Sequence, residues 1–291
     1  MTESRLAKTA TRLQRSSGNV RLSFRRRGPK TVLDQLHQQG CYKARFPTRT
    51  EQRTSEAILI NTSGGLTDGD ELSCRAAWHS DSAALITTQA AERIYRSRQE
   101  SAVVRSNLTI GERATACWLP QETILFDGGR LDRVTTIAMT RSSRLFAAES
   151  IVFGRVAMGE ATTSGRVFDR WRVRIDGRLA FADSLLFDGD GDSTLAERLA
   201  RATVAGSAVA MATLIYAGPD CGSFMSGLRR VLKESDLAAG ATDLGPLIIA
   251  RVLAGNGRSL RHAVAQVFAI TQNGRRDPAD RGFELPRVWN C

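Results

Sequence analysis

Strict alternation of side-chain character over residues 102–110 constrains the fold of this chain more than any other feature. Apolar or small residues from Ala102 to Ile110 alternate with outward-facing residues such as Arg105, and after Gly111-Glu112 the alternation resumes up to Trp118. A period of two is typical of a strand that buries one face. Two such runs joined by a short turn predict antiparallel β-strands.

Comparable short runs recur along most of the chain, and their spacing favours a β-rich fold over βαβ units. They cover residues 20–25, 56–61, 134–140, 170–175, 179–187, 209–216 and 247–253. Two segments have helical periodicity instead, with apolar stripes at 224–232 and 260–268. Ser259 is expected to cap the second helix and Gly274 to end it. The sequence therefore predicts a mainly β protein with about two α-helices.

Composition sets limits on location. At 291 residues and 42% hydrophobic, the chain can bury a substantial core. Its longest nearly apolar run, 208–217, is about half of the ~20 residues that a membrane helix needs, and no apolar signal core opens the chain. We therefore expect a cytoplasmic protein that has no membrane partner.

Positive charge is concentrated near the N-terminus. The formal net charge is +11, and residues 1–30 contain nine Lys or Arg against the single acid Glu3. Residues 1–17 are polar and lack periodicity, so we interpret them as a disordered extension before one β-rich domain at 18–291. Their Arg-rich character also resembles a transit peptide. This basic segment could attract nucleic acid, an anionic surface or an acidic protein.

Motifs for catalysis and tight metal binding are missing from the sequence. The five cysteines (41, 74, 117, 221 and 291) are widely spaced and form no Cys-x-x-Cys, which argues against a disulfide framework or a zinc site. No nucleophile elbow or His-Glu-x-x-His pair occurs, and His262 lies off its helical stripe. The acids at 188–192 lack the distal Glu of a calcium loop and favour a solvated turn.

Two turns carry unusual chemistry. Pro120 precedes a short strand at 123–126, which Asp127-Gly128-Gly129 ends, and Glu122 and Asp127 bracket that strand. Gly64-Gly65 ends the strand at 56–61, and no Gly-Lys-Ser/Thr follows, so this loop is not a P-loop. We assign structural roles to four turn residues: Gly64, Gly65, Pro120 and Gly128.

Four segments together resemble the urease accessory protein D family (UreD, called UreH in some organisms): residues 59–70, 87–97, 117–133 and 154–160. Weaker agreement covers nearly the whole chain, and Asp68 stands where a small residue is expected. The resemblance implies a superhelical stack of many short strands with two helices. It also implies a non-catalytic subunit that binds the F accessory protein, which recruits the G GTPase, and docks on apo-urease. A dimer within that complex is allowed.

The same resemblance implies that nickel passes through an internal tunnel. A conduit must hold Ni²⁺ weakly enough to release it, and scattered oxygen ligands suit this better than a His/Cys cage. We therefore expect no tightly bound cofactor, only Ni²⁺ in transit. The candidates for the path are Asp68, Asp70, Thr87, Thr88, Glu92, Glu122, Asp127 and Glu160. Each could instead cap a turn or pair with a basic side chain.

Two other classes of function stay open at this point. A nucleic-acid-binding protein would need aromatic residues among its basic ones, and only Phe24 falls in the basic segment. A hydrolase would need catalytic residues assembled from distant positions. Salt-dependent oligonucleotide binding would favour the first of these, and nickel incorporation into co-expressed urease favours the assembly factor.

Overall fold

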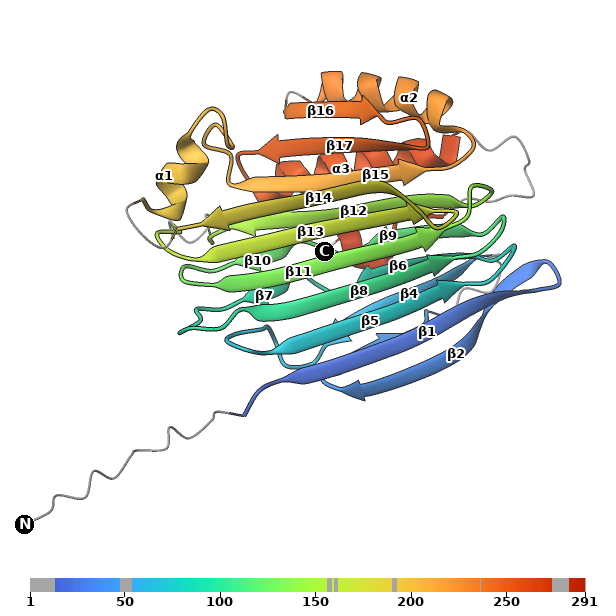
Figure 1. The fold of residues 1–291 in the computed structure, drawn as a ribbon, viewed down its shortest axis with the longest axis horizontal. Helices are drawn as coiled ribbons and strands as arrows, with labels where there is room; N and C mark the ends of the chain where they lie inside the picture. The colour runs from blue at the N-terminus through green and yellow to red at the C-terminus, as the bar shows by residue number, and fades with distance from the viewer. Residues whose placement is uncertain are drawn as a thin grey trace, which may run out of the picture.

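The computed structural model describes residues 14–47, 54–155, 159, 162–189, 193–235, 237–273 and 283–290. Two twisted β-sheets pack face to face (Figure 1). Sheet A contains, in spatial order, β14 (Arg178–Asp188), β13 (Arg166–Ile175), β11 (Arg130–Met139), β8 (Ala102–Ile110), β5 (Glu71–Trp78), β1 (Ser17–Arg27) and β2 (Lys30–Gly40).

Sheet B lies behind sheet A in the same view. It contains β16 (Ala238–Asp243), β17 (Leu247–Ala254), β15 (Ala210–Ala217), β12 (Arg144–Phe153), β9 (Thr115–Leu119), β6 (Ala83–Thr88), β4 (Ser55–Asn61) and β3 (Tyr42–Arg45), with β10 (Thr123–Leu125) and β7 (Glu92–Ile94) pairing beside β12. The prediction of a mainly β superhelical stack is confirmed.

The prediction of antiparallel pairing is wrong for the centre of both sheets. Strands β1, β5, β8, β11 and β13 pair in parallel in sheet A, as do β4, β6, β9 and β12 in sheet B. Successive strands alternate between the sheets, so Gly111-Glu112 turns a corner from β8 to β9 and does not close a hairpin. Antiparallel pairs occur at the ends of the stack, for example β1 with β2.

The prediction of antiparallel pairing failed because the alternation reflects burial of one face and carries no information on strand direction. Ala102, Ser106, Leu108 and Ile110 of β8 are buried, whereas Arg105 is exposed. Most parallel sheets are covered on both faces by crossover helices and lack this pattern. Here the strand-to-strand crossover leaves one face of sheet A open, so a parallel strand acquires the alternation of an antiparallel one.

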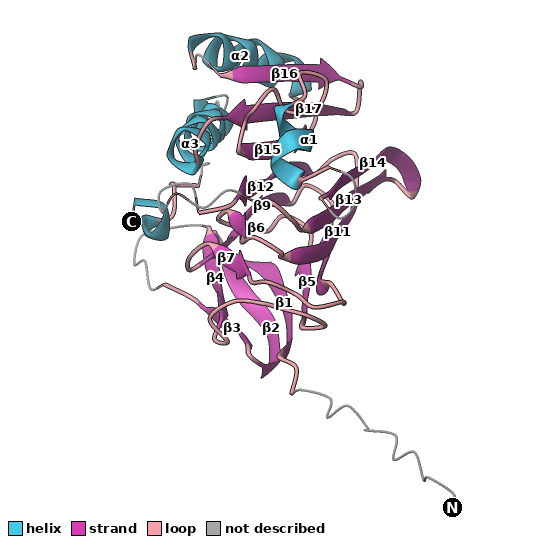
Figure 2. Cartoon of the chain, turned by 90° about the vertical axis from the view of Figure 1, so that its left-hand side faces the viewer, coloured by secondary structure: helices cyan, strands magenta, loops and turns pink. Residues whose placement is uncertain are grey.

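Three α-helices complete the described chain: α1 (Leu195–Ala200), α2 (Cys221–Glu234) and α3 (Gly257–Asn273). Figure 2 shows α2 and α3 on the outer side of sheet B, where they contact β12 and β15–β17. Both predicted apolar stripes are confirmed, since Phe224, Leu228 and the 260–268 stripe are buried, and His262 is exposed as expected.

The predicted cap of the second helix is wrong. Helix α3 begins at Gly257, and the side-chain oxygen of Asn256 accepts a hydrogen bond from the Ser259 N–H at 2.8 Å. Asn is among the strongest N-cap residues and stands where it can reach the third residue of the helix. Gly274, the predicted stop, lies outside the described residues.

The core has two layers. The larger apolar cluster fills the space between the sheets and includes Phe24, Trp78 and Trp171. The smaller one joins sheet B to α2, α3 and the C-terminal segment, with Phe146 and Phe268 as its aromatic contact at 5.8 Å. A charged side chain that lies within either apolar layer loses its hydration, which is costly unless the charge is paired.

The turn at Gly64-Gly65 gives the first testable prediction. Both residues have positive φ, +80° at Gly64 and +146° at Gly65. A Cβ on Gly65 would lie 2.9 Å from the Arg93 carbonyl oxygen and nearer still to the Tyr95 ring, whereas a Cβ on Gly64 meets nothing within 4 Å. Gly65→Val should therefore lower the unfolding free energy by about 1–3 kcal/mol, and Gly64→Val by less. Thermal unfolding of the matched pair tests this, and equal losses would contradict it.

Candidate functional site

The segments that carry the family resemblance meet around β7 and β10, which pair beside β12. Strand β10 pairs in parallel with both β7 and β12, and Leu66 bridges to Ile94. The Gly154 N–H donates to the Leu125 carbonyl oxygen at 2.7 Å. The Tyr95 and Phe126 rings pack edge to face at 5.0 Å. Residues distant in the sequence thus form one continuous region.

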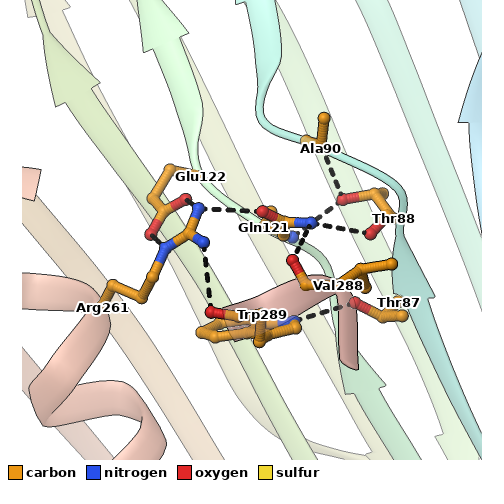
Figure 3. A network of polar contacts seen from close by, with 8 residues as sticks. All are labelled: Thr87, Thr88, Ala90, Gln121, Glu122, Arg261, Val288 and Trp289. Atoms are coloured by element: carbon orange, nitrogen blue, oxygen red, sulfur yellow. Dashed lines mark hydrogen bonds and ion pairs between the residues drawn. The ribbon is translucent and has the colours of Figure 1, made fainter. Parts of the chain in front are cut away.

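Glu122 lies in a closed polar network on the outer side of sheet B (Figure 3). It is 4% exposed, and its two oxygens accept hydrogen bonds from Arg261 of α3 at 2.8 and 2.6 Å. The same guanidinium donates to the Gln121 side chain at 2.8 Å and to the Trp289 carbonyl oxygen at 3.4 Å. Glu122 is therefore a buried ion-pair partner.

Thr87 and Thr88 belong to the same network. The Trp289 indole N–H donates to the Thr87 hydroxyl at 3.0 Å. The Thr88 hydroxyl accepts from the Gln121 N–H at 2.9 Å and donates to the Ala90 carbonyl oxygen at 3.0 Å. The C-terminal segment is thereby fastened to β6 and α3 (Figure 3). Replacing Thr87 by Lys would break this attachment. A loss of nickel transfer in such a variant would therefore not show that Thr87 lies on a cation path.

Asp68 and Asp70 hold the start of the described chain. Asp70 accepts from the Ser16 N–H at 2.7 Å and from the Thr67 N–H at 2.9 Å. Asp68 pairs with Arg15 at 3.2 Å and accepts from two N–H groups in the 99–100 loop. Burial raises the pKa of Asp68, but these donors outweigh it and lower the pKa below its usual value. Both carboxylates therefore act as fasteners.

Asp127 fastens the turn after β10. One of its oxygens accepts from the Thr163 N–H at 2.8 Å, the Thr163 hydroxyl at 2.8 Å and the Ser164 N–H at 2.9 Å, and the other pairs with Arg96. Although burial raises the pKa of Asp127, these donors lower it overall. Gly128 has φ +74° in the same turn, as its assigned structural role requires. Glu160 lies outside the described residues.

Glu92 differs from the other candidates. Its carboxylate accepts from the Asn61 side-chain amide at 3.0 Å and from the Arg93 N–H at 3.3 Å. It lines a cavity of about 140 Å³ together with Thr88, Asn61 and Tyr42. Burial raises the pKa of Glu92 to about 7, more than these hydrogen bonds lower it. Among the candidates in the described chain, Glu92 is a carboxylate that lines a cavity and that has hydrogen bonds but no tight ion pair.

A second prediction follows from the pKa of Glu92. The native state binds a proton there more tightly than the unfolded chain does, so Glu92 contributes stability below about pH 4.5 that is lost as the pH rises to about 7. Replacing Glu92 by Gln should remove this loss, up to about 3 kcal/mol. Unfolding free energies at several pH values should therefore converge for the two proteins at low pH. Glu112→Gln, at an exposed corner, is the control, and an equal effect there would contradict the assignment.

A buried charged cluster lies between the sheets, and sequence reasoning missed it. Arg133 of β11 donates to both oxygens of Asp169 on β13, at 2.9 and 2.8 Å, and its Nε lies 3.1 Å from Glu149 of β12. Glu149 also accepts from the Trp118 indole N–H and the Thr135 hydroxyl, each at 2.8 Å. The three charged residues are at most 5% exposed.

Electrostatics link this charged cluster to Glu92. Burial raises the pKa of Glu149, and the Arg133 charge opposes that rise. Burial lowers the pKa of Arg133, but Asp169 and Glu149 raise it overall. Tyr42 is buried, and its pKa is raised first by burial and then by charge at Cys74, Glu92 and Glu149. Tyr42 therefore lies within electrostatic reach of both the Glu92 cavity and the charged cluster.

The sequence does contain a signal for the charged cluster. Arg133 and Asp169 occupy inward positions of strands whose other inward residues include Leu131, Ile137, Val167 and Val173. Glu149 and Ser150 interrupt the otherwise apolar run from Leu145 to Phe153. Charged residues at core positions of a strand are costly unless paired, so their coincidence indicates a buried network.

The described residues contain no cluster of three or more His, Cys, Asp or Glu side chains arranged to hold a metal ion. Cys41, Cys74, Cys117 and Cys221 form no disulfide among the described residues, and Cys291 lies outside them. Within these same ranges no helix is both long and apolar enough to cross a membrane.

The fold and its interior define a class of protein: a β-superhelical stack whose apolar core between the two sheets encloses a buried charged cluster. The family model for the UreD urease accessory protein matches residues 16–290. The urease accessory protein UreD of Agrobacterium fabrum is 38% identical over 284 residues, covering 98% of this chain and 94% of that protein. UreD proteins of Rhizobium leguminosarum bv. trifolii (98% of this chain, 99% of that protein) and Methylobacterium sp. (96% of each) are also 38% identical. The chain belongs to the UreD urease accessory protein family.

Proposed function

We propose that this chain acts as a non-catalytic subunit in urease maturation, together with the F and G accessory proteins, and passes Ni²⁺ towards apo-urease through its interior. Membership of the UreD family supports the maturation role. The observation that carries the conduit is the Glu92 cavity, which Tyr42, Asn61 and Thr88 also line.

The interior suits a cation in transit. The charged cluster holds two carboxylates, Glu149 and Asp169, against one guanidinium, and Glu92 adds a third carboxyl group at the cavity. Oxygen ligands that already have hydrogen-bond partners bind a divalent ion less tightly than a dedicated cage of thiolates and imidazoles would. This set of groups favours entry of Ni²⁺ and its release.

The path proposed here differs from the eight residues predicted from sequence. Glu92 and Thr88 line the cavity, whereas Asp68, Asp70, Asp127 and Glu122 fasten loops or pair with arginines. The proposed path therefore begins at the cavity that Glu92, Thr88 and Tyr42 line and leads inward to Glu149.

Nickel loading of urease tests this path. Urease is co-expressed with the accessory proteins and with the wild-type chain, Glu92→Gln or Glu112→Gln. We expect Glu92→Gln to lower the nickel bound per urease active site several-fold while the yield of co-purified complex stays unchanged, because a carboxylate attracts the cation and an amide does not. Exposed Glu112 provides the matched control.

The two measurements separate the claims. If nickel and complex yield fall together, Glu92 supports the fold or an interface, and the conduit assignment is wrong. If neither falls, Glu92 is not on the path. If urease acquires nickel normally without the chain, the maturation role itself is wrong.

A further inference from the structure

The outer face of sheet A is open. Figure 1 looks directly onto this face, with strands β14 to β2 in front and no helix crossing them. Helices α2 and α3 contact strands of sheet B, and α1 touches sheet A at its edge strand β14. Over the described residues, therefore, a seven-stranded surface has no covering layer from its own chain.

Arginines dominate this face. Strand register sets Arg21 of β1 beside Arg75 of β5, with Arg75 in turn beside Asn107 of β8. Six arginines point outward from the central strands: Arg21, Arg75, Arg105, Arg170, Arg172 and Arg174. Like charges on neighbouring strands destabilise a sheet. The adjacent Arg21 and Arg75 therefore destabilise the folded sheet, which points to a role other than stability.

The acids on this face do not neutralise the arginines near its centre. Asp132 pairs with Arg170, and Asp34 pairs with Arg25 at 2.9 Å. Glu71 stands at the end of β5. Within the described ranges, Arg21, Arg75 and Arg105 form no ion pair with any acid.

The face is also hollowed over β2, β1, β5 and β8. A groove of about 830 Å³ is lined by Arg21, Arg75, Asn107, His37 and His79, among others. This volume falls within the range of about 300–1,000 Å³ typical of ligand sites. The groove thus presents the guanidinium groups of Arg21 and Arg75 in a recess, beside His37 and a His79 imidazole that lies 3.5 Å from Asp34.

We propose that the outer face of sheet A is a docking surface for an acidic protein segment, whose carboxylates bind Arg21 and Arg75 in the groove. A guanidinium can bind a carboxylate through two parallel hydrogen bonds, which gives geometric specificity as well as charge. Exposed Leu179 and Leu186, at 52% and 54%, lie on β14, at the edge of the sheet opposite the groove. Arginine is enriched at protein–protein interfaces, which supports a protein as the partner.

Nucleic acid fits this face less well. Single-stranded nucleic acid needs open aromatic faces for stacking, and the Phe168 ring is covered by the Arg170 guanidinium at 4.4 Å. The assignment of the partner as another protein of urease maturation rests on the proposed function above.

Charge reversal tests the docking surface. The face variant carries Arg21→Glu, Arg75→Glu and Arg105→Glu in the full chain on a solubility fusion. The matched control carries Arg229→Glu, Arg230→Glu and Lys233→Glu, which changes the charge equally on the exposed side of α2. The probe is a labelled peptide of alternating Glu and Gly, followed by fluorescence anisotropy. We expect the face variant to bind it about tenfold or more weakly, and the control to bind as the wild type does.

A neutral variant, Arg21→Gln with Arg75→Gln, serves as a second test in case the face variant misfolds. We expect it to bind the peptide several-fold more weakly than the wild type and to have an unchanged circular dichroism spectrum. Equal loss in face and control variants, or no loss in either, overturns the proposal. Tighter binding of a DNA duplex or of phosphatidylserine vesicles than of the peptide, lost in the face variant, also overturns it.

Co-purification separates this proposal from the function. Co-expressed with urease and its accessory proteins, the face variant should recover less complex than the control variant. If the face variant loses peptide binding but urease loads nickel without the chain, the proposed function is wrong and the docking surface for an acidic segment stands. If peptide binding survives while nickel loading depends on the chain, the docking surface fails and the function stands.

Discussion

Replacing Arg133 by Met is expected to lower the unfolding free energy by about 3–5 kcal/mol, because it leaves two buried carboxylates without their countercharge. Asp169 and Glu149 are 2% and 3% exposed and have no access to water that could replace the guanidinium. Chemical denaturation of the wild type and the variant measures the loss directly.

The matched control is Arg113→Met. Arg113 also donates to both oxygens of an aspartate, Asp81, at 2.7 and 2.8 Å, but this pair is at the surface. Exposed pairs contribute little to stability, so this variant should unfold like the wild type. Similar losses in both variants would show that burial does not decide the energetics of the charged cluster.

The loss in Arg133→Met should also depend on pH. The pKa of Glu149 is already raised by burial while Arg133 is present, and removing the arginine removes the charge that opposes that rise. The native variant would then bind more protons than its unfolded chain, so its stability must increase as the pH falls. The difference from wild type should accordingly be smaller at about pH 4.5 than at neutral pH, and a constant difference would argue against buried carboxylates as the cause.

Local patterns in the sequence predicted the elements of this fold well. The apolar stripes of α2 and α3 and strands such as β8, β11 and β13 were readable because burial of one face imposes a period, whereas β12 and β16 were not predicted. Strand direction was not readable, because β5, β8 and β11 have the same pattern whether their neighbours run parallel or antiparallel. Direction depends on how the chain crosses between sheets, which is a property of the whole stack.

The candidate site was harder to predict than the fold. Carboxylates in family-like segments gave a reasonable search list, but their partners come from distant parts of the chain: Arg261 for Glu122 and Ser164 for Asp127. A partner more than thirty residues away leaves no local signature. The basic face was missed for the same reason, since Arg75, Arg105 and Arg172 are scattered in sequence and are brought onto one face by strand register.

Replacing Arg261 by Met is the second change expected to cost about 3–5 kcal/mol, because Glu122 would remain buried and unpaired. The same substitution removes the hydrogen bonds to Gln121 and to the Trp289 carbonyl oxygen, so the C-terminal segment should detach (Figure 3). Hydrogen exchange of residues 283–290 should rise together with the drop in unfolding free energy. Arg258→Met, at an exposed position of the same helix, is the control.

A double variant decides between a structural and a transport role for Glu122. Glu122→Gln combined with Arg261→Met removes both charges, and we expect it to recover part of the stability lost in the single variant, since no unpaired charge remains buried. If the role is structural, nickel per urease active site should follow stability across the set, lowest in Arg261→Met and partly restored in the double variant. Glu122→Gln alone keeps hydrogen-bond acceptor capacity towards Arg261 and should lose less. Should Glu122→Gln instead keep wild-type stability and complex yield while nickel loading falls, Glu122 belongs to the cation path and its assignment as a fastener is wrong.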